Sequence, residues 1–338
     1  MFLGHYHILL TVDVEDWFQV ENFKPWIAFS SWDSCELRVE KSTHQMLDLL
    51  DSIEMKHTEY SRQDTEGRSQ EAEPTIQHTA SNSPQSSGSE VSGSNTKSSE
   101  NCISCPRKLK ATFFVLGWLA ERLPHLVREI QTRGHEVASH GYGHELCNQC
   151  SADSLKADLV KSRKLLEDII GDRIYGYRAP SFSISDDVLT VIAEAGYLYD
   201  SSYNSFSLHS RYGKISTSGN KKKGIANLIS KDFYELPISN LTLGKKTFPF
   251  GGGAYFRLLP PALFRFGVRR ILEQQGAYLF YVHPWELDSG QPRVKEASAN
   301  SKFRHYSNLG KTHQRLERLL KRFSGCRFIT CANYLELG

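Results

Sequence analysis

Short apolar runs alternate with helical patterns along most of this sequence. Seven runs have the length and the β-branched or aromatic content of strands, and segments with helical spacing lie between several of them. This order is typical of repeated βα units around a parallel sheet or barrel. Because the usual βα barrel has eight strands, we expect an α/β fold built as an incomplete or distorted barrel. The runs are HILLTVD, ATFFVL, HEVASH, IYGYR, YLYDSS, FYELPI and YLFYVH.

Helix signals separate several of these runs. Residues 185–196 have Ser185 as an N-cap, two acids in the first turn and Gly196 as a terminator. Residues 119–134 contain Pro124, which predicts a helix start after it. Residues 311–325 place apolar side chains on one face and basic ones on the other, which predicts a helix on the outside of the fold.

Composition indicates a globular protein, and we expect a single domain over residues 1–338. The chain is 39% hydrophobic and 23% charged, which is enough for a sizeable core. Its formal net charge of +3 is small for 338 residues, so no nucleic-acid partner is expected. The sequence shows neither a signal-peptide pattern nor an apolar run of about 18 residues, so we expect no transmembrane segment and a cytoplasmic location.

Residues 57–108 differ sharply from their surroundings. They are rich in Ser, Asn, Thr and Glu and nearly devoid of large apolar residues, so they cannot repay the entropy of ordering. Patterned structure flanks them, which predicts a disordered insertion within the domain. The seven cysteines, an odd number, indicate reduced thiols. The two C-x-x-C pairs, at 102/105 and 147/150, are expected at opposite barrel ends, so we predict free thiols there and no shared zinc site.

Five polar residues with catalytic potential follow the predicted strands at their carboxyl ends. In βα folds these ends form the rim where active sites are built. Each residue alone could be a cap or a hydrogen-bonded structural group, but five in one topological position favour a site. They are Asp13, His140, Arg178, Asp200 and His283.

A metal site is the second expectation at this rim. His140 and His144 are four residues apart, which allows both imidazoles to converge on one ion. A catalytic zinc commonly takes three protein ligands, often two histidines and a carboxylate, and keeps an open position for water. The acids of TVDVEDWF, namely Asp13, Glu15 and Asp16, would complete the set, because like charges so close are costly without a cation.

Several motifs occur in an order typical of one family. TVDVEDWF, SHGYGH, YRAP, YDSS and YVHPWE resemble the ordered motifs of the polysaccharide deacetylases, grouped as carbohydrate esterase family four. ATFFVLGW, YRAPSFSI, HPWELD and FRHYSNLGKT further resemble the exosortase-associated subgroup of exopolysaccharide-locus deacetylases. The resemblance implies a distorted seven-stranded (β/α) barrel, with residues 285–338 as a subgroup-specific extension that packs on it.

The resemblance also implies a role for each motif residue. Asp13 is expected to be the general base, Arg178 its ion-pair partner and His283 the general acid. His140 and His144 are expected to be ligands of a divalent metal, for which Zn²⁺ is our expectation.

The first two motifs depart from the family pattern. Relatives usually have two adjacent acids in the first motif, and Ser or Thr after the first metal histidine, where this chain has DVED and Gly141. The third ligand is therefore open. Asp13 and Glu15 share a parity along a strand and can both face the barrel mouth, which favours Glu15. Asp16 stays the alternative if the chain turns before it.

Four further residues have a functional and a structural interpretation. Asp200 could orient His283 or cap a turn. Arg257 follows the glycine-rich run FPFGGG, which could receive an anionic group of the substrate or form a tight turn. Tyr142 and Trp285 offer flat faces to sugar rings, or are ordinary packing residues.

These features predict metal-dependent hydrolysis of N-acetyl groups on a hexosamine-containing polysaccharide. We expect a role in exopolysaccharide biosynthesis and association with the synthesis machinery. One alternative is a small or cyclic amide hydrolase on the same barrel. The other is a catalytically silent glycan-binding protein, which the intact set of rim residues disfavours.

Overall fold

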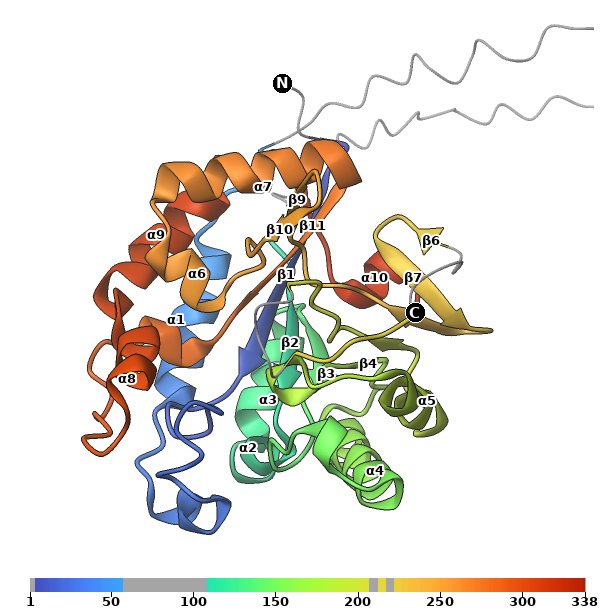
Figure 1. Ribbon diagram of the computed structural model, residues 1–338, viewed down its shortest axis with the longest axis vertical. Helices are drawn as coiled ribbons and strands as arrows, with labels where there is room; N and C mark the ends of the chain where they lie inside the picture. Colours follow the sequence, from blue (N-terminus) through green and yellow to red (C-terminus); the bar gives the residue numbers. More distant parts are fainter. Residues whose placement is uncertain (1–3, 57–107, 207–211, 217–221, 338) are drawn as a thin grey trace, which may run out of the picture. The chain divides into compact units, whose positions relative to one another are not determined.

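The computed structural model describes residues 4–56, 108–206, 212–216 and 222–337 (Figure 1). The predicted insertion at 57–108, apart from Lys108, lies outside these residues, and so do Cys102 and Cys105.

A ten-stranded sheet organises the described residues. Its strands are β1 (His7–Val14), β2 (Thr112–Val115), β3 (Glu136–Ser139), β4 (Gly176–Tyr177), β5 (Tyr199–Asp200), β6 (Lys222–Lys223), β7 (Ala226–Ser230), β8 (Phe233–Glu235), β11 (Ala277–Val282) and β12 (Arg327–Phe328). The order is β11-β1-β2-β3-β4-β5-β8-β7-β6, with β12 beside β1. Neighbours from β11 to β8 are parallel, whereas β7 and β6 are antiparallel additions. The sheet curls into a half-barrel.

The predicted strand runs all contain strands, namely β1, β2, β3, β4, β5, β8 and β11. The count of seven nevertheless does not describe this sheet, because β6, β7 and β12 extend it. The position of β12 has a simple cause. Since β2 pairs with β1 only from Thr11 onward, the edge of β1 at His7 and Ile8 is left for β12.

Strand β1 is the central strand at the site. Its apolar residues are buried between β11 on one side and β2 on the other, as expected for a parallel strand covered on both faces. In register, Val12 pairs with Val282 and with Phe113. The carboxyl ends of these parallel strands meet at one rim, and all five predicted rim residues lie there.

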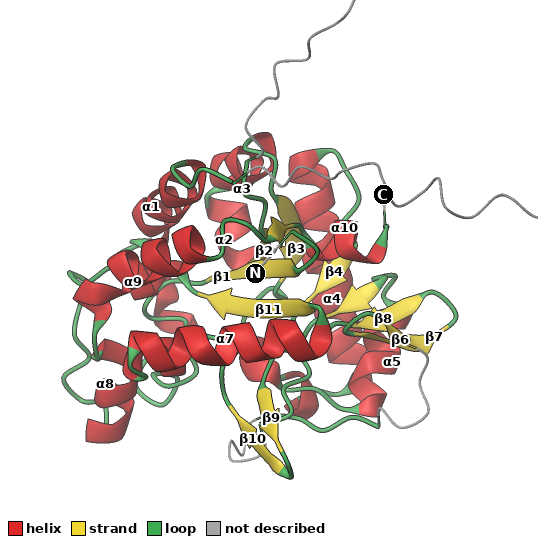
Figure 2. Ribbon diagram, turned by 90° about the horizontal axis from the view of Figure 1, so that it is seen from above, coloured by secondary structure: helices red, strands yellow, loops and turns green. Residues whose placement is uncertain are grey.

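Helices flank the sheet. They are α1 (Val39–Asp51), α2 (Gly117–Arg122), α3 (Pro124–Thr132), α4 (Ala152–Ile170), α5 (Asp186–Glu194), α6 (Gly253–Leu258), α7 (Pro261–Gln275), α8 (Ala299–Tyr306), α9 (Leu309–Arg322) and α10 (Cys331–Leu335). Ser185 caps α5 by accepting a hydrogen bond from the N–H of Val188. Pro124 is the first residue of α3, and the separate helix α2 precedes it. Figure 2 shows α7 lying along β11.

The residues after β11 return to the sheet. A short 3₁₀ turn, η5 (Pro284–Leu287), follows β11 and packs against α1 and α9. Helix α8 then leads into α9, which contacts α6, and β12 pairs with the beginning of β1. The predicted extension at 285–338 therefore contributes a strand to the sheet as well as helices around it. Among the described residues, no helix combines the length and apolar character needed to cross a membrane.

Candidate active site

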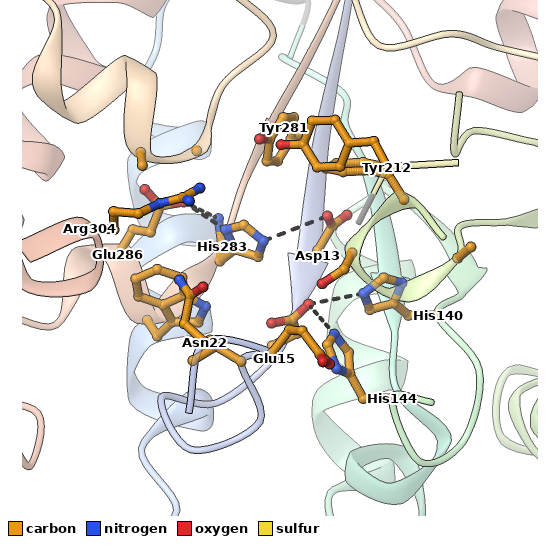
Figure 3. A pocket seen from close by; sticks show the side chains of 18 of the residues that line it. Asp13, Glu15, Asn22, His140, His144, Tyr212, Tyr281, His283, Glu286 and Arg304 are labelled. Atoms are coloured by element: carbon orange, nitrogen blue, oxygen red, sulfur yellow. Dashed lines mark hydrogen bonds and ion pairs between the residues drawn. The ribbon is translucent and has the colours of Figure 1, made fainter. Parts of the chain in front are cut away.

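The three acids of the first motif have different surroundings. Asp13 lies near the end of β1 and Glu15 directly follows the strand, and both line one cavity (Figure 3). Asp16 does not line it. Burial raises the pKa of Asp16 to about 6, although hydrogen bonds favour its ionised form. Its carboxylate secures the beginning of α1, so the alternative that Asp16 is a metal ligand is wrong. It accepts hydrogen bonds from the backbone N–H groups of Trp17 (2.8 Å), Arg38 (2.6 Å) and Val39 (2.8 Å).

Glu15 converges with the two motif histidines. Its Oε1 lies 3.0 Å from Nε2 of His140 and 3.1 Å from Nε2 of His144. One potential ligand atom from each residue lies within 4.8 Å of the others, and all three side chains are buried. Burial raises the pKa of Glu15, but the adjacent imidazoles more than offset this and hold it well below its ordinary value.

The hydrogen bonds of His140 test whether a cation fits here. Its Nδ1 donates to the carbonyl oxygen of Arg178 at 2.7 Å, so in the neutral ring Nε2 carries a lone pair. That lone pair faces a carboxylate oxygen of Glu15, and two acceptors cannot bond to each other. A divalent cation held between them resolves the conflict, because it accepts both lone pairs. Two histidines and one carboxylate form a ligand set typical of catalytic zinc.

Unusual backbone conformations aim the second histidine. Gly141 has φ 76° and His144 has φ 56°, in the left-handed region that non-glycine residues seldom occupy. Asp158 of α4 accepts the N–H of Tyr142 at 3.0 and 3.2 Å and so fixes the loop. A Cβ at position 141 would lie 3.0 Å from the Asp158 carboxylate, and both this contact and the positive φ favour glycine there. Asp158 was not predicted, because no local sequence signal marks it.

Arg178 holds Asp13 through a short ion pair, as the family pattern implies. Its Nη1 lies 2.6 Å from Oδ1 of Asp13, and both side chains are almost fully buried. The guanidinium is fixed on its other edges too. It donates to Oγ1 of Thr11 (2.7 Å) and to the carbonyl and hydroxyl of Ser201 (2.8 Å each), and it lies 4.1 Å from the ring of Phe114. Asp13 is therefore held in one orientation toward the cavity.

His283 lies across the cavity from the histidine loop (Figure 3). Its Nε2 is 3.8 Å from Oδ2 of Asp13, and its Nδ1 donates to Oε1 of Glu286 at 2.6 Å. The other carboxylate oxygen of Glu286 lies 2.7 Å from Nε of Arg257. Glu286 was missed at the sequence level, although HPWE places a glutamate three residues after a strand-end residue followed by proline, a capping-box spacing.

The surroundings of His283 favour its protonated form. Burial lowers its pKa, but the hydrogen bond that it donates to Glu286 and the charges of Glu15, Glu286 and Asp13 more than offset this and raise it to about 9. Glu286 itself has a lowered pKa, because the effect of burial is exceeded by Arg257 and His283. A protonated imidazole at neutral pH suits a general acid.

Of the two interpretations of Asp200, the structure bears out the turn cap and not the orientation of His283. Its carboxylate accepts the N–H of Ser202 at 2.9 Å and the hydroxyl of Ser202 at 2.7 Å. The same hydroxyl oxygen accepts the N–H of Ala179 at 2.7 Å. Burial raises the pKa of Asp200. Asp200 therefore shapes the loop behind Arg178, and Glu286 occupies the position beside His283.

Arg257 is not available as the predicted anion receptor. It is 1% exposed, and four of its five N–H donors are engaged within the protein. One of these N–H groups binds Glu286, and the others bind three carbonyl oxygens in and just after α8. Arg257 therefore joins α8 to Glu286, the partner of His283. The carbonyls are those of Arg304 (2.8 Å), His305 (2.8 Å) and Ser307 (2.6 Å).

The glycine-rich run serves close packing. Gly252 has φ 134°, and a Cβ there would lie 1.9 Å from the carbonyl oxygen of Tyr281. Gly251 accepts the N–H of Tyr281 at 2.8 Å, so the run lies directly against β11. Gly251 and Gly252 therefore have a structural role, whereas Gly253 and Ala254 line the cavity, so an anion-binding nest at this run stays a prediction.

Of the two aromatic residues predicted to contact a sugar, only Trp285 lines the cavity and Tyr142 does not. Trp285 lines the cavity and stacks between His283, at 5.1 Å between ring centroids, and His305, at 4.2 Å. Tyr142 does not line it. Its hydroxyl donates to Glu121 at 2.6 Å and its ring lies under the ammonium of Lys161, so the interpretation of Tyr142 as a substrate contact is wrong.

The cavity between these groups is small, with a volume of about 120 Å³. Pockets that enclose a whole drug-sized ligand are several times larger, so this one suits a single substituent of a larger molecule. His144, Ser181 and Phe182 line it with left-handed backbone, and such outliers cluster at functional sites. Asn22, Tyr212 and Arg304 also lie on its wall (Figure 3).

The described cysteines are free thiols. Cys147 is buried beside the hydroxyl of Tyr177, at 3.2 Å, and burial raises its pKa to about 12. A thiol with so high a pKa is unreactive at neutral pH. The cysteine pair at 102/105 lies outside the described residues. That the two C-x-x-C pairs share no zinc site therefore stays a prediction from the sequence.

Two family models match the chain. "Polysaccharide deacetylase" matches residues 106–199, and "Domain of unknown function (DUF3473)" matches residues 201–336. His140, His144 and Arg178 fall in the first segment, and His283 and Glu286 fall in the second. Asp13 and Glu15 precede both.

Curated relatives point the same way. A peptidoglycan-N-acetylglucosamine deacetylase of Bacillus cereus is 32% identical over 90 residues, which is 27% of this chain and 42% of the relative. A peptidoglycan deacetylase of Helicobacter pylori is 30% identical over 158 residues, which is 46% of this chain and 52% of the relative. The matches thus span about half, or less, of these relatives.

A solved structure shares the fold. It comes from Mycobacterium smegmatis and is provisionally named a polysaccharide deacetylase. It aligns with a TM-score of 0.54 at 18% identity, covering 99% of this chain and 90% of that one. Residues 106–199 are therefore similar to the polysaccharide deacetylases, and the chain shares the fold of this solved structure.

Proposed function

We propose that this protein is a metal-dependent N-deacetylase of a hexosamine-containing glycan. The observation that carries the proposal is the convergence of three groups on one small cavity. They are the Glu15, His140 and His144 cluster, the Asp13–Arg178 pair and the His283–Glu286 pair. A cavity that admits a single substituent suits the acetamido group of a sugar whose ring stays outside.

Glu15, His140 and His144 would hold the metal, and we propose Zn²⁺ because of this ligand set. When bound, the ion would polarise an amide carbonyl and lower the pKa of a water to about 7. Asp13, fixed by Arg178, is placed to take the proton of the attacking water.

His283 would donate its Nε2 proton to the departing amine, and Glu286 stabilises the proton-bearing form until then. Because Nε2 lies 3.8 Å from the carboxylate of Asp13, base and acid face the same reacting group. The reaction cleaves the C–N bond of the acetamido group and releases acetate and a free amine.

The substrate is proposed from the relatives. The name of the B. cereus relative specifies N-acetylglucosamine, so we propose an N-acetylhexosamine within a polymer as the reacting unit. Membership of the exosortase-associated subgroup and a role in exopolysaccharide biosynthesis rest on the sequence motifs. Cytoplasmic location and association with synthesis machinery stay predictions.

The test is acetate release from N-acetylglucosamine oligomers by protein loaded with Zn²⁺, with and without a chelator. We expect release that the chelator abolishes and that Asp13→Asn reduces by at least about 10²-fold. Metal content of the wild type and Glu15→Ala is measured in parallel. Absence of acetate from every glycan tested, with a metal-free wild type, would falsify the proposal.

The alternatives give different outcomes in the same assay. Oligomer binding without acetate release would indicate a silent glycan-binding protein. Hydrolysis of a small cyclic amide in preference to the oligomers would indicate an amide hydrolase on the same fold.

A further inference from the structure

A second hollow lies beside the catalytic cavity, and helix α8 separates the two. It has a volume of about 420 Å³ and is open to solvent. Lys302, Phe303 and Tyr306 of α8 line this outer hollow, while Arg304 of the same helix lines the catalytic cavity. Because a helix with its side chains is about 10–12 Å across, the two hollows lie within reach of one short oligosaccharide.

The helix geometry explains this division. At about 100° per residue, Lys302 and Tyr306 fall on one face of α8 and Arg304 falls on the opposite face. Phe303 lies on the ridge between these faces and is 59% exposed, the highest value among the exposed large apolar side chains of the described residues. An aromatic ring on a ridge between two hollows is placed to stack on a sugar that bridges them.

The charge around α8 is one-sided. Residues 291–307 contain four cations, Arg293, Lys295, Lys302 and Arg304, and a single acid, Glu296. Among the described residues that line the outer hollow, three are cationic and none is acidic.

The outer hollow is also held in shape. The guanidinium of Arg293 lies 4.7 Å from the ring centroid of Tyr306, and Nζ of Lys302 donates to the carbonyl of Lys295 at 2.6 Å. These contacts do not neutralise Arg293 and Lys302, because a ring face and a carbonyl oxygen carry no net negative charge.

We propose that the outer hollow is a subsite for a carboxylate-bearing sugar in the glycan chain whose N-acetyl group enters the catalytic cavity. The inference rests on the proposed function and narrows its substrate to an acidic heteropolysaccharide. One sugar would stack on Phe303, the next would place its carboxylate among Arg293, Lys295 and Lys302, and the N-acetylated unit would lie on the Arg304 side.

The experiment measures binding separately from turnover. Titration calorimetry on the Asp13→Asn protein compares two probes, a hexamer of N-acetylglucosamine and a hexasaccharide that alternates N-acetylglucosamine with glucuronic acid. The test variant changes Arg293, Lys295 and Lys302 to Ala. A matched control removes three exposed cations of α4 or its following turn, Lys156, Lys164 and Arg173, across the molecule from α8 (Figure 1).

We expect the acidic hexasaccharide to bind about tenfold more tightly than the neutral hexamer, as three exposed charge pairs allow. The triple variant on the hollow should lose this preference, the α4 control should keep it, and about 0.5 M salt should suppress it. Phe303→Ala should lower the affinity for both hexasaccharides about two- to tenfold, and Phe303→Tyr should restore that affinity.

Equal affinity of the Asp13→Asn protein for the two hexamers would overturn the inference. So would a preference that survives in the triple variant. Sedimentation with phosphatidylglycerol vesicles that depends on the same three cations, without any hexasaccharide preference, would assign the hollow to a lipid surface and would equally refute it. A retained preference with no acetate release by the wild type would instead reject the proposed function and leave the subsite standing.

Discussion

Replacing Glu286 by Gln should move the alkaline limb of the pH–rate profile to lower pH. Glu286 contacts His283 at 2.6 Å inside the protein, and this contact helps raise the pKa of His283 to about 9. Gln keeps an acceptor but loses the charge. A hydrogen bond to a charged group contributes about 1.5–3 kcal/mol. Since about 1.4 kcal/mol corresponds to one pKa unit, the pKa should fall by about 1–2 units.

The sign follows from the role of His283. It donates a proton, so activity is retained below its pKa and is lost as the pH rises through it. In Glu286→Gln the loss should therefore begin about 1–2 pH units earlier. A cation at Glu15 would lower the pKa of His283 in both proteins, so the difference between them is the measured quantity. The assay is kcat/KM for acetate release between about pH 6 and 10.

Two controls keep this test decisive. Breaking the pair leaves Arg257 buried and uncompensated, which costs about 3–5 kcal/mol of stability, so the double variant Glu286→Gln/Arg257→Met removes that charge as well. Asp200→Asn should move the limb far less, because Asp200 bonds to Ser202. The reasoning would be refuted if the alkaline limbs of the wild type and of a folded Glu286→Gln protein coincide. It would also be refuted if Asp200→Asn moves the limb further than Glu286→Gln does.

Three further predictions concern metal binding, turnover and stability. Glu15→Ala should abolish stoichiometric metal, measured by elemental analysis, whereas Asp16→Asn should keep the metal and lower the free energy of unfolding by about 1–3 kcal/mol in urea titrations. Equal metal loss in both would contradict the assignment. Arg178→Lys should reduce kcat at least about tenfold with little change in KM, because a single ammonium cannot reproduce the planar set of contacts; an unchanged kcat would reject the role. Gly252→Ala should cost more than about 2 kcal/mol of stability, because its Cβ would collide with the carbonyl of Tyr281; a melting temperature equal to that of wild type would show that the backbone can move away.

The parts of the site that follow a strand could be predicted from sequence. Hydrophobic runs locate the strands, and parallel strands bring their carboxyl ends to one rim, so local pattern alone predicts that Asp13, His140, Arg178 and His283 lie together. Strand parity also favoured Glu15 over Asp16, because alternate residues face alternate sides.

The partners of these residues could not be predicted in the same way. Whether Asp200 or Glu286 lies beside His283 depends on how the chain turns after β11, and the structure has a 3₁₀ turn that begins at Pro284. The glycine-rich run was ambiguous for a related reason. A glycine required for close approach to another strand and a glycine required by a ligand have the same sequence signal.

The two family segments line one cavity, the proposed active site. The segment that matches the polysaccharide deacetylase model supplies His140, His144 and Arg178, and the segment of unknown function supplies β11, His283 and Glu286. Strand β1 precedes both and lies between β2 from one and β11 from the other. Without the second segment, β1 would expose an apolar edge and the cavity would lose His283, the proposed general acid. Residues 201–336 therefore belong to the same folded unit as the proposed site, and Arg257 extends this dependence to α8, where the proposed glycan subsite lies.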